Sequence, residues 1–363
     1  MFTKGLNTNI KSSETLPASF YSNAEIFELA KEKIFANSWQ WVGQRRELFT
    51  GAEQFVPFEF MDGFIPEPLL LSKGKEESLT CMSNVCTHRG MLLLQHPSAS
   101  KQLICGYHGR RFDSKGRFKS MPCFDDAENF PRDCEDLHRV PLSEWGGFLF
   151  SSLQPSFEWA PIAAKLDERV GFLDMEKFRF SAKDSKEYHV HSHWALYCDN
   201  YLEGFHIPFV HKELNQLLDG DSYETQCFPH GSLQIGYSAN DAERFELPEG
   251  HPDFGKNVTA YYYWIYPNLM LNFYPWGLSV NVVKPVSVNR TRVQFLTFIA
   301  DEEKWERMSG AYLTDKVERE DEFVVEAVHK GLQSRFYPGG RFSPSKEQGV
   351  HHFQLMLKAA LED

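Results

Sequence analysis

Two closely spaced Cys–His pairs constrain this chain more than any other feature of its sequence. One residue separates Cys86 from His88, two residues separate Cys105 from His108, and sixteen residues lie between the pairs. Both pairs fall among short apolar segments broken by Gly, Asp and Pro, which is typical of β-strands joined by tight turns. We therefore expect two loops at the tip of paired strands, facing each other so that two thiolates and two imidazoles share one metal centre.

Two cysteines on one iron and two histidines on the other are the ligand set of a Rieske 2Fe-2S cluster. Imidazole is neutral where thiolate is anionic, so the histidine-bound iron is the easier one to reduce. Tyr107 and the loop amides are suited to donate hydrogen bonds to the sulfurs. The main alternative is a structural zinc site, but such sites usually space their ligands Cys-x2–4-Cys and His-x3–5-His. A chance coincidence of four residues is the other alternative.

Length and charge exclude several other classes of protein. The chain has 363 residues, enough for two domains, and a formal net charge of −12, which is unsuited to nucleic-acid binding. The first 16 residues lack a secretory pattern and no apolar run is long enough to span a bilayer, so we expect a cytoplasmic protein. Seven cysteines at irregular spacing favour thiols or metal ligands over a disulfide framework.

The apolar pattern predicts a change of architecture along the chain. Ser22-Asn23-Ala24-Glu25 resembles a capping box that starts a helix with Ile26 and Phe35 on one face. Residues 39–155 are predicted to form a small all-β domain, and residues 156–180 a connector with a short helix. The rest combines both element types, which predicts an α+β fold. The expected strands are 188–194, 260–266, 270–274, 278–286 and 291–299, and the expected helices are 199–205, 302–332 and 345–361.

A second constellation lies between Asn200 and His211. Glu203 and His206 are three residues apart and would share a helical face. Pro208 should break that helix, so the chain can return His211 toward His206. Two imidazoles and one carboxylate leave open positions on Fe(II) for oxygen and substrate. Spacing does not decide whether the carboxylate is Glu203 or belongs to the C-terminal helix, where the candidates are Glu318, Glu320, Asp321, Glu322 and Glu326. A solvated helix end with two hydrogen-bonded histidines is the alternative.

With both constellations present, the chain resembles the α subunits of Rieske non-haem iron oxygenases from about Leu16 to Leu357. The resemblance implies that His206 and His211 are iron ligands and that Asp321 completes the ligand set. It makes Asn200 and Glu203 further catalytic residues, with Glu203 in the position of the acid that connects the two redox centres. The nearest branch oxidises choline, carnitine and betaines. The segments that carry this likeness are Asn84–Arg89, Asp199–His211, Tyr266–Asn268 and Val350–Phe353.

The resemblance also implies an architecture and an assembly. Residues 1–38 would be an N-terminal helix and arm, 39–155 the Rieske domain, and 156–363 a helix-grip (START-like) catalytic domain with a central antiparallel sheet. A separate NAD(P)H-dependent reductase, with or without a ferredoxin, would supply electrons. In a head-to-tail homotrimer, His108 of one subunit would approach Glu203 and His206 of its neighbour.

The implied reaction uses O2 to hydroxylate or oxidatively N-demethylate a small quaternary ammonium compound. Aromatic faces bind such cations, although each aromatic residue is also a candidate for the core. The candidates are Trp194, Tyr197, Tyr201, Phe205, Tyr263, Tyr266, Phe273 and Trp276. The alternatives are the α subunit of an aromatic-ring hydroxylating dioxygenase and, more remotely, a Rieske electron carrier without oxygenase activity.

Two further histidine groups are open to a metal interpretation. His189, His191 and His193 alternate, so we expect them on one half-exposed strand face and not in a third metal site. His193-Trp194 stands where the family commonly has Asn-Trp. His351-His352 is predicted to serve in packing.

Overall fold

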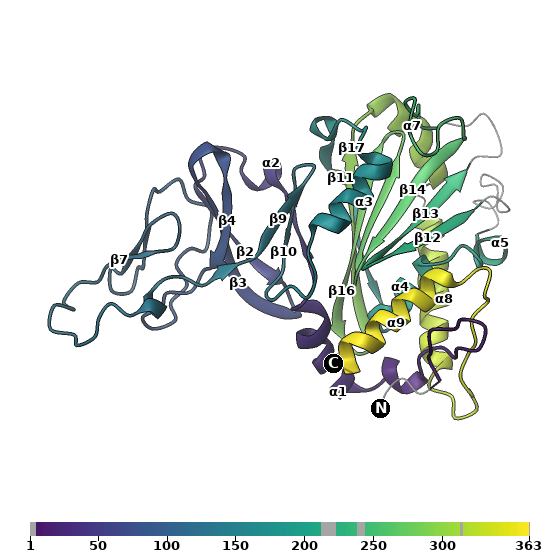
Figure 1. The fold of residues 1–363 in the computed structure, drawn as a ribbon, viewed down its shortest axis with the longest axis horizontal. Coiled ribbons are helices and arrows are strands. Elements are labelled where there is room, and N and C mark those ends of the chain that lie inside the picture. The colour runs from purple at the N-terminus through teal and green to yellow at the C-terminus, as the bar shows by residue number, and fades with distance from the viewer. Residues whose placement is uncertain (1–4, 212–222, 238–243, 313–314, 363) are drawn as a thin grey trace. The chain divides into compact units, whose positions relative to one another are not determined.

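The computed structural model describes residues 5–211, 223–237, 244–312 and 315–362. Contacts divide the chain into two compact units. One unit comprises residues 36–157, and the other combines residues 1–35 with residues 158–363. The N-terminal segment is therefore part of the larger unit, and each unit is described by itself (Figure 1).

Residues 36–157 form three small antiparallel sheets with strand orders β1-β10-β9, β2-β3-β4-β8 and β5-β6-β7. Helical segments are short, as in α2 (Arg45–Leu48). The all-β prediction for this region is confirmed. The strands are β1 (Gln40–Gln44), β2 (Phe55–Met61), β3 (Ile65–Lys73), β4 (Leu79–Ser83), β5 (Leu103–Ile104), β6 (Arg111–Phe112), β7 (Phe118–Ser120), β8 (Arg139–Val140), β9 (Leu142–Trp145) and β10 (Phe148–Ser151).

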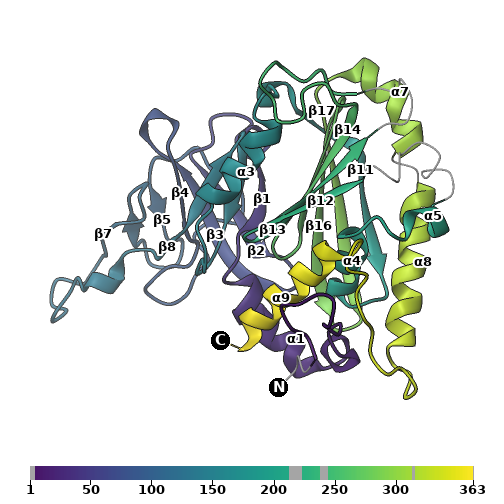
Figure 2. The same cartoon turned by 45° about the vertical axis from the view of Figure 1, so that its right-hand side comes forward.

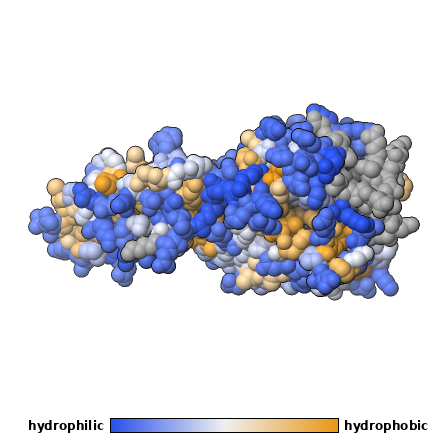
Figure 3. Space-filling view, turned by 90° about the horizontal axis from the view of Figure 1, so that it is seen from above, coloured by the Kyte–Doolittle hydropathy of each residue, from blue (hydrophilic) through white to orange (hydrophobic). Residues whose placement is uncertain are grey.

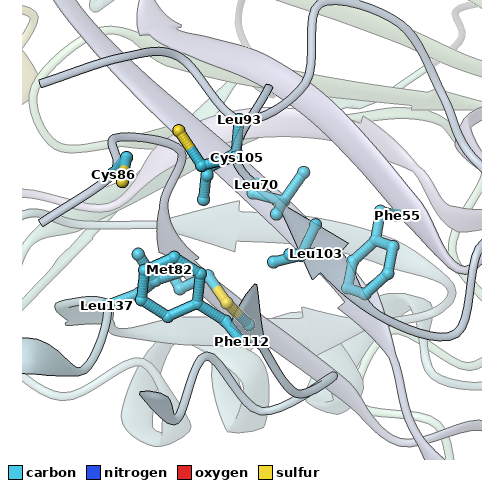
Figure 4. Packing of buried hydrophobic residues seen from close by; sticks show 9 residues of the cluster. All are labelled: Phe55, Leu70, Met82, Cys86, Leu93, Leu103, Cys105, Phe112 and Leu137. Carbon is cyan, nitrogen blue, oxygen red and sulfur yellow. The ribbon is translucent and has the colours of Figure 1, made fainter. Parts of the chain in front are cut away.

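The core of this unit holds the two cysteines of the Cys–His pairs. Phe55, Leu70 and Phe112 are fully buried, and the thiols of Cys86 and Cys105 belong to the same cluster of side chains. In Figure 4 the two cysteines lie at one end of this cluster and Phe55 lies at the other. Burying these apolar side chains holds the strands together, so the loops that carry the cysteines start from a rigid base.

The larger unit is built on one antiparallel sheet of seven strands in the order β11-β17-β16-β15-β14-β13-β12 (Figure 1). Its central strands are buried on both faces, as the unbroken burial along β15 shows. The predicted central antiparallel sheet is thereby confirmed. The strands are β11 (Arg179–Val190), β12 (Glu224–Phe228), β13 (Gly231–Tyr237), β14 (Val258–Ile265), β15 (Leu269–Tyr274), β16 (Gly277–Ser287) and β17 (Arg290–Ile299).

Helices cover the sheet and its ends (Figure 2). Helix α4 packs on β16 and on α8, while α9 packs on β12 and α4. Within α9, Val350, Phe353 and Leu357 are buried, as expected for the apolar stripe of a core-facing helix. The helices are α1 (Ala24–Ala30), α3 (Ala160–Val170), α4 (Trp194–Tyr201), α5 (Ile207–Val210), α7 (Glu302–Tyr312), α8 (Asp315–Gly331) and α9 (Gln348–Glu362).

Several predicted element boundaries are wrong. Asn23 and not Ser22 caps α1, since its side chain accepts the backbone N–H groups of Glu25 and Ile26. The predicted strand 188–194 ends at Val190. Helix α4 then starts at Trp194 because His193 caps it, so this helix starts and ends earlier than the predicted range 199–205 and overlaps it only at residues 199–201. The predicted helix 302–332 is described as two helices, α7 and α8, and residues 313–314 between them lie outside the described residues.

The visible surface in Figure 3 is mostly hydrophilic, with apolar side chains in separate areas. The most exposed large apolar side chains are Phe336, Phe323 and Phe209, at 86%, 74% and 72%. Within the described residues, no helix combines the length and the apolar character needed to cross a bilayer.

Candidate redox and iron sites

The two Cys–His loops have the same backbone turn. In the first loop, Cys86 accepts the N–H of Gly90 through its carbonyl at 3.0 Å and donates its own N–H to Met91. In the second, Cys105 is paired in the same way with Gly109 and Arg110, again with 3.0 Å for the glycine contact. Both glycines have φ of +72°, a conformation that favours glycine, which explains the residue type at the end of each loop.

The loops bring two thiols and two imidazoles together, as the sequence predicted. Cys86 and Cys105 are each 2% exposed, and burial raises the pKa of the Cys86 thiol. The ring centroids of His88 and His108 are 4.9 Å apart, and the Tyr107 ring lies 3.7 Å from that of His108. The buried Nδ1 of His108 has no hydrogen-bond partner in the described structure, so this nitrogen is free to bind a metal.

These four residues do not converge on one point. Among the described residues, His206, His211 and Asp321 form the group in which at least three ligand atoms of His, Cys, Asp or Glu lie within 4.8 Å of one another. The two Cys–His pairs are not part of this group. Two thiolates and two imidazoles on facing loops are the donor set of a 2Fe-2S centre that has two cysteines on one iron and two histidines on the other.

The second site forms where the chain reverses after α4. Helix α4 ends at Tyr201, and α5 begins at Ile207 with Pro208 in its first turn. The prediction that Glu203 and His206 share a helical face is therefore wrong, because both lie in the link between two helices. Glu203 closes that link with its own carboxylate, which accepts the backbone N–H groups of Phe205 and His206.

Asp321 of α8 lies between the two imidazoles. Its Oδ1 is 3.0 Å from Nε2 of His211 and 3.6 Å from Nε2 of His206. Asn200 donates its side-chain N–H to the same oxygen at 2.7 Å. The structure thus brings together the residues that the resemblance names, and their role as iron ligands stays a prediction.

Each imidazole is held from behind by a second carboxylate. Glu203 Oε1 is 2.7 Å from Nδ1 of His206, and Glu320 Oε2 is 2.8 Å from Nδ1 of His211. Such a partner fixes the orientation of a ligating histidine and directs its other nitrogen toward the metal. The sequence identified Glu320 only as one possible ligand. Its position next to Asp321 could have indicated a role near the iron, but whether its side chain reaches His211 depends on the fold.

The charges around His211 affect its protonation. Burial lowers the pKa of His211, but the hydrogen bonds and charges of Asp321 and Glu320 outweigh burial and raise the pKa above its usual value. A divalent cation would replace this proton between the same three groups. The donor set of two imidazoles and one carboxylate suits Fe(II) with open coordination positions.

A cavity of about 370 Å³ opens beside these residues, between the sheet and helices α4 and α8. This volume is in the range of small-molecule sites. Its walls carry many hydrogen-bonding groups, among them Gln234, Asn272, Ser279, Asn281 and Thr297, and its aromatic residues are Tyr188, Tyr197, Tyr201, Tyr223, Tyr262, Tyr274, Phe295 and Trp305.

Glu318 is an additional acid in the cavity wall. Tyr197 donates its hydroxyl to Glu318 at 2.6 Å. Burial raises the pKa of Glu318 to about 8, and the negative charges of Asp321 and Glu322 act in the same direction. The sequence named Glu318 only as a possible ligand, yet it is not part of the converging group.

The aromatic candidates divide into lining residues and core residues. Tyr197 and Tyr201 line the cavity. Phe205 is 46% exposed and lies outside the cavity-lining set. The remaining candidates are buried, as the packing alternative implied: Trp194, Tyr263, Tyr266, Phe273 and Trp276.

The other histidines do not form a metal group within the described residues. His193 is buried among Phe20, Tyr21 and Phe27, and burial lowers its pKa to about 3. The expectation of a half-exposed strand face is therefore wrong for His193. His351 and His352 each bond a backbone carbonyl through Nε2, which agrees with packing.

Family models match most of the chain. The Rieske 2Fe-2S domain matches residues 38–131, and the catalytic domain of the ring-hydroxylating alpha subunit matches residues 179–363. The chain is 28% identical to the carnitine monooxygenase oxygenase subunit of Escherichia coli strain K12, over 98% of this chain and 96% of that protein. It is 27% identical to the chloroplastic choline monooxygenase of Beta vulgaris, over 96% of this chain and 77% of that protein.

Solved structures share the fold. A quaternary ammonium Rieske monooxygenase superimposes with a TM-score of 0.74 at 23% identity, covering 95% of both chains. Naphthalene 1,2-dioxygenase from Rhodococcus sp. superimposes with a TM-score of 0.72 at 15% identity, covering 96% of this chain and 95% of that one. The chain therefore belongs to the ring-hydroxylating alpha subunits of the Rieske oxygenases, O2-using oxidoreductases that carry a 2Fe-2S cluster and a mononuclear iron.

Proposed function

We propose that this chain is the terminal oxygenase component for a small quaternary ammonium substrate, which it hydroxylates or N-demethylates. The observation that carries the proposal is Glu318, a buried carboxylate in an aromatic-walled cavity beside His206, His211 and Asp321. Aromatic faces and a carboxylate together bind a cation that cannot donate hydrogen bonds. The choline and carnitine monooxygenases that the chain resembles are named for quaternary amines, which supports the same class.

We assign the cluster to Cys86, His88, Cys105 and His108 in residues 36–157, and the iron to His206, His211 and Asp321 in the larger unit. When bound, the cluster supplies single electrons and the iron supplies the chemistry of O2. The protein provides orientation. Glu203 and Glu320 hold the imidazoles, and Asn200 fixes the carboxylate of Asp321 by donating to Oδ1.

Tyr197 and Glu318 act on the substrate. The Tyr197 hydroxyl keeps one oxygen of Glu318 hydrogen-bonded, so the carboxylate stays directed along the cavity wall. A substrate cation close to this carboxylate would place one of its methyl groups near the iron ligands. Hydroxylation of an N-methyl carbon gives a hemiaminal, which collapses to formaldehyde and the demethylated amine.

A hydrocarbon substrate is less well matched to this cavity. A flat apolar ring would leave the charged form of Glu318 in the cavity wall without an opposite charge, which a quaternary ammonium group supplies. This cost favours the amine over the ring-hydroxylating alternative.

We further propose a head-to-tail homotrimer that works with a separate NAD(P)H-dependent reductase. Apolar side chains surround the cluster loops, with Ile104 at 50% and Tyr107 at 53% exposure. Phe209 and Phe323, at 72% and 74%, are exposed near the iron ligands. An interface between these two different faces is heterologous, and a three-fold rotation would close it into a ring. Sedimentation equilibrium tests the assembly, and a monomer at micromolar concentration would contradict it.

The test of function is turnover by the purified chain, loaded with cluster and iron and supplied with NADH and a reductase. Choline, carnitine and γ-butyrobetaine are compared with naphthalene, and O2 uptake is measured together with formaldehyde and hydroxylated products. We expect coupled O2 uptake with at least one amine and none with naphthalene. Dihydrodiol formation from naphthalene would overturn the proposal, and so would equal turnover of amines by Glu318→Gln and by wild type above pH 8, where Glu318 is ionised.

A further inference from the structure

A buried ion pair connects the two loops that carry the proposed cluster ligands. Arg110, at the end of the second loop, is 1% exposed and pairs with Glu135, which is 2% exposed. The backbone carbonyl of Glu135 accepts the hydroxyl of Thr87 from the first loop at 2.8 Å. The backbone carbonyl of Arg110 accepts the N–H of Cys105 at 2.8 Å.

The surroundings keep this charge away from water. Three aromatic rings enclose the guanidinium of Arg110, with centroids at 4.6 Å for Phe118, 5.6 Å for Phe112 and 5.7 Å for Phe130. An ion pair inside a protein costs desolvation energy that its own attraction barely offsets. Aromatic faces supply part of the compensation. A buried ion pair is therefore weak evidence for a purely stabilising role. Its charges can instead act on the neighbouring loops that carry the proposed cluster ligands.

The group as a whole is positively charged. Glu135 has a second partner in Arg132, whose Nε lies 2.8 Å from Oε1, and the side chain of Arg132 is 64% exposed. Two guanidinium groups and one carboxylate leave one net positive charge. Of the two guanidinium groups, that of Arg110 is buried and that of Arg132 is at the surface, so the buried positive charge belongs to Arg110.

The positive end of the pair belongs to a ligand-bearing loop. Arg110 follows His108 by two residues, and its backbone carbonyl accepts the N–H of Cys105 at 2.8 Å. Glu135 contacts the other loop through its backbone carbonyl, which accepts the hydroxyl of Thr87. A buried positive charge in this position stabilises added negative charge at the cluster.

We propose that Arg110 and Glu135 are positioning residues whose buried charges set the reduction potential of the 2Fe-2S cluster. Reduction adds one electron from the reductase and forms or breaks no bond, so the change at the cluster is one unit of negative charge. Arg110 stabilises the reduced state and Glu135 moderates that effect. The inference rests on the assignment of Cys86, His88, Cys105 and His108 as ligands.

The test uses the full-length, cluster-loaded protein and spectroelectrochemical titration of the cluster. In an interior with an effective dielectric constant of about 20, a unit charge about 10 Å away changes an equilibrium about tenfold. We therefore expect Arg110→Gln to lower the reduction equilibrium constant about tenfold, which is a 59 mV fall for a one-electron couple. Glu135→Gln should raise the potential. Arg111→Gln is the matched control, because Arg111 is the next residue in the chain but is exposed, and it should change the constant less than threefold.

Arg110→Lys separates charge from shape. Lysine keeps the positive charge but loses the planar fork that fills the space among the phenylalanines. If the reduction equilibrium constant of Arg110→Lys stays within threefold of the wild-type value, the role of the charge is supported. A fall as large as that of Arg110→Gln overturns it in favour of packing.

The remaining outcomes also decide. The proposal is overturned if Arg110→Gln and Glu135→Gln shift the potential in the same direction. It is also overturned if neither substitution changes the reduction equilibrium constant threefold while the EPR spectrum stays unchanged. If Arg110→Gln does not retain its cluster, a raised potential in Glu135→Gln supports the proposal and an unchanged one overturns it. A wild-type chain without a Rieske EPR signal would instead contradict the ligand assignment.

Discussion

Replacing Asp321 by Asn should remove the mononuclear iron and leave the cluster in place. Asp321 is the anion of the converging group, since histidines that bind a metal do so as neutral imidazoles. The substitution changes the charge of the donor set from −1 to 0 while preserving the size of the side chain. The amide can still occupy the space beside Asn200, so the fold should tolerate the change.

The magnitude follows from the role of the residue. Removing a partner that only orients a ligand costs 10–100-fold in metal affinity, so the loss of the anionic ligand itself should cost at least about 100-fold. That factor corresponds to about 2.7 kcal/mol at 1.36 kcal/mol for each tenfold change. After desalting, iron should fall from about three atoms per chain, two in the cluster and one alone, to about two.

Iron is measured by plasma mass spectrometry, and the cluster by the EPR spectrum of the reduced protein. Glu320→Gln should weaken iron binding by 10–100-fold, because Glu320 only orients His211. Glu303→Gln, which changes an exposed acid of α7, is the control and should retain all iron. The ligand assignment is refuted if Asp321→Asn keeps three iron atoms, or if the cluster disappears together with the third atom.

Three further substitutions test other parts of the structure. Because burial raises the pKa of Glu318 to about 8, wild type should gain affinity for a quaternary amine as pH rises through that value, and Glu318→Gln should lose this gain and have a KM about tenfold higher above pH 8; an unchanged KM–pH profile contradicts the counter-ion role. Burial raises the pKa of Asp199 to about 7 from 3.8, so its contribution to stability is present below about pH 4 and is lost as pH rises to about 7. Asp199→Asn should therefore stabilise the chain at pH 8 by up to about 4 kcal/mol in urea unfolding, and a destabilised variant would show that the bonds from Tyr21 and Gln354 need the carboxylate. Leu70→Ala should cost about 2–5 kcal/mol in the same assay because Leu70 is fully buried, and a loss below 1 kcal/mol would mean that the core of residues 36–157 closes around the cavity.

Local patterns predicted the elements whose signal lies within a few residues. The strands of the larger sheet alternate with clear turns, so their predicted ranges agree with β14, β15, β16 and β17 to within a few residues. The predictions failed where a single side chain chose the boundary. His193 caps α4 with Nδ1 and ends the predicted strand, and Glu203 holds the chain out of a helix between α4 and α5. Competing hydrogen bonds of this kind have no periodic signature.

The sequence by itself determined the chemical types at both centres. Two Cys–His pairs on glycine-ended turns, and two histidines five residues apart, carry the proposed donor atoms within short segments, so the sequence could name them as candidates. Only the tertiary structure decided which distant groups complete each centre. Spacing left Asp321 as one of five acids on the C-terminal helix and only the family resemblance singled it out, whereas the packing of α8 on α4 brings its carboxylate to the two imidazoles. Glu135 has no local feature that connects it with Arg110. Side chains 25 residues apart (Arg110 and Glu135) or 121 residues apart (Tyr197 and Glu318) meet only through packing, and burial gives Glu318 and Arg110 electrostatic effects that they would lack in water.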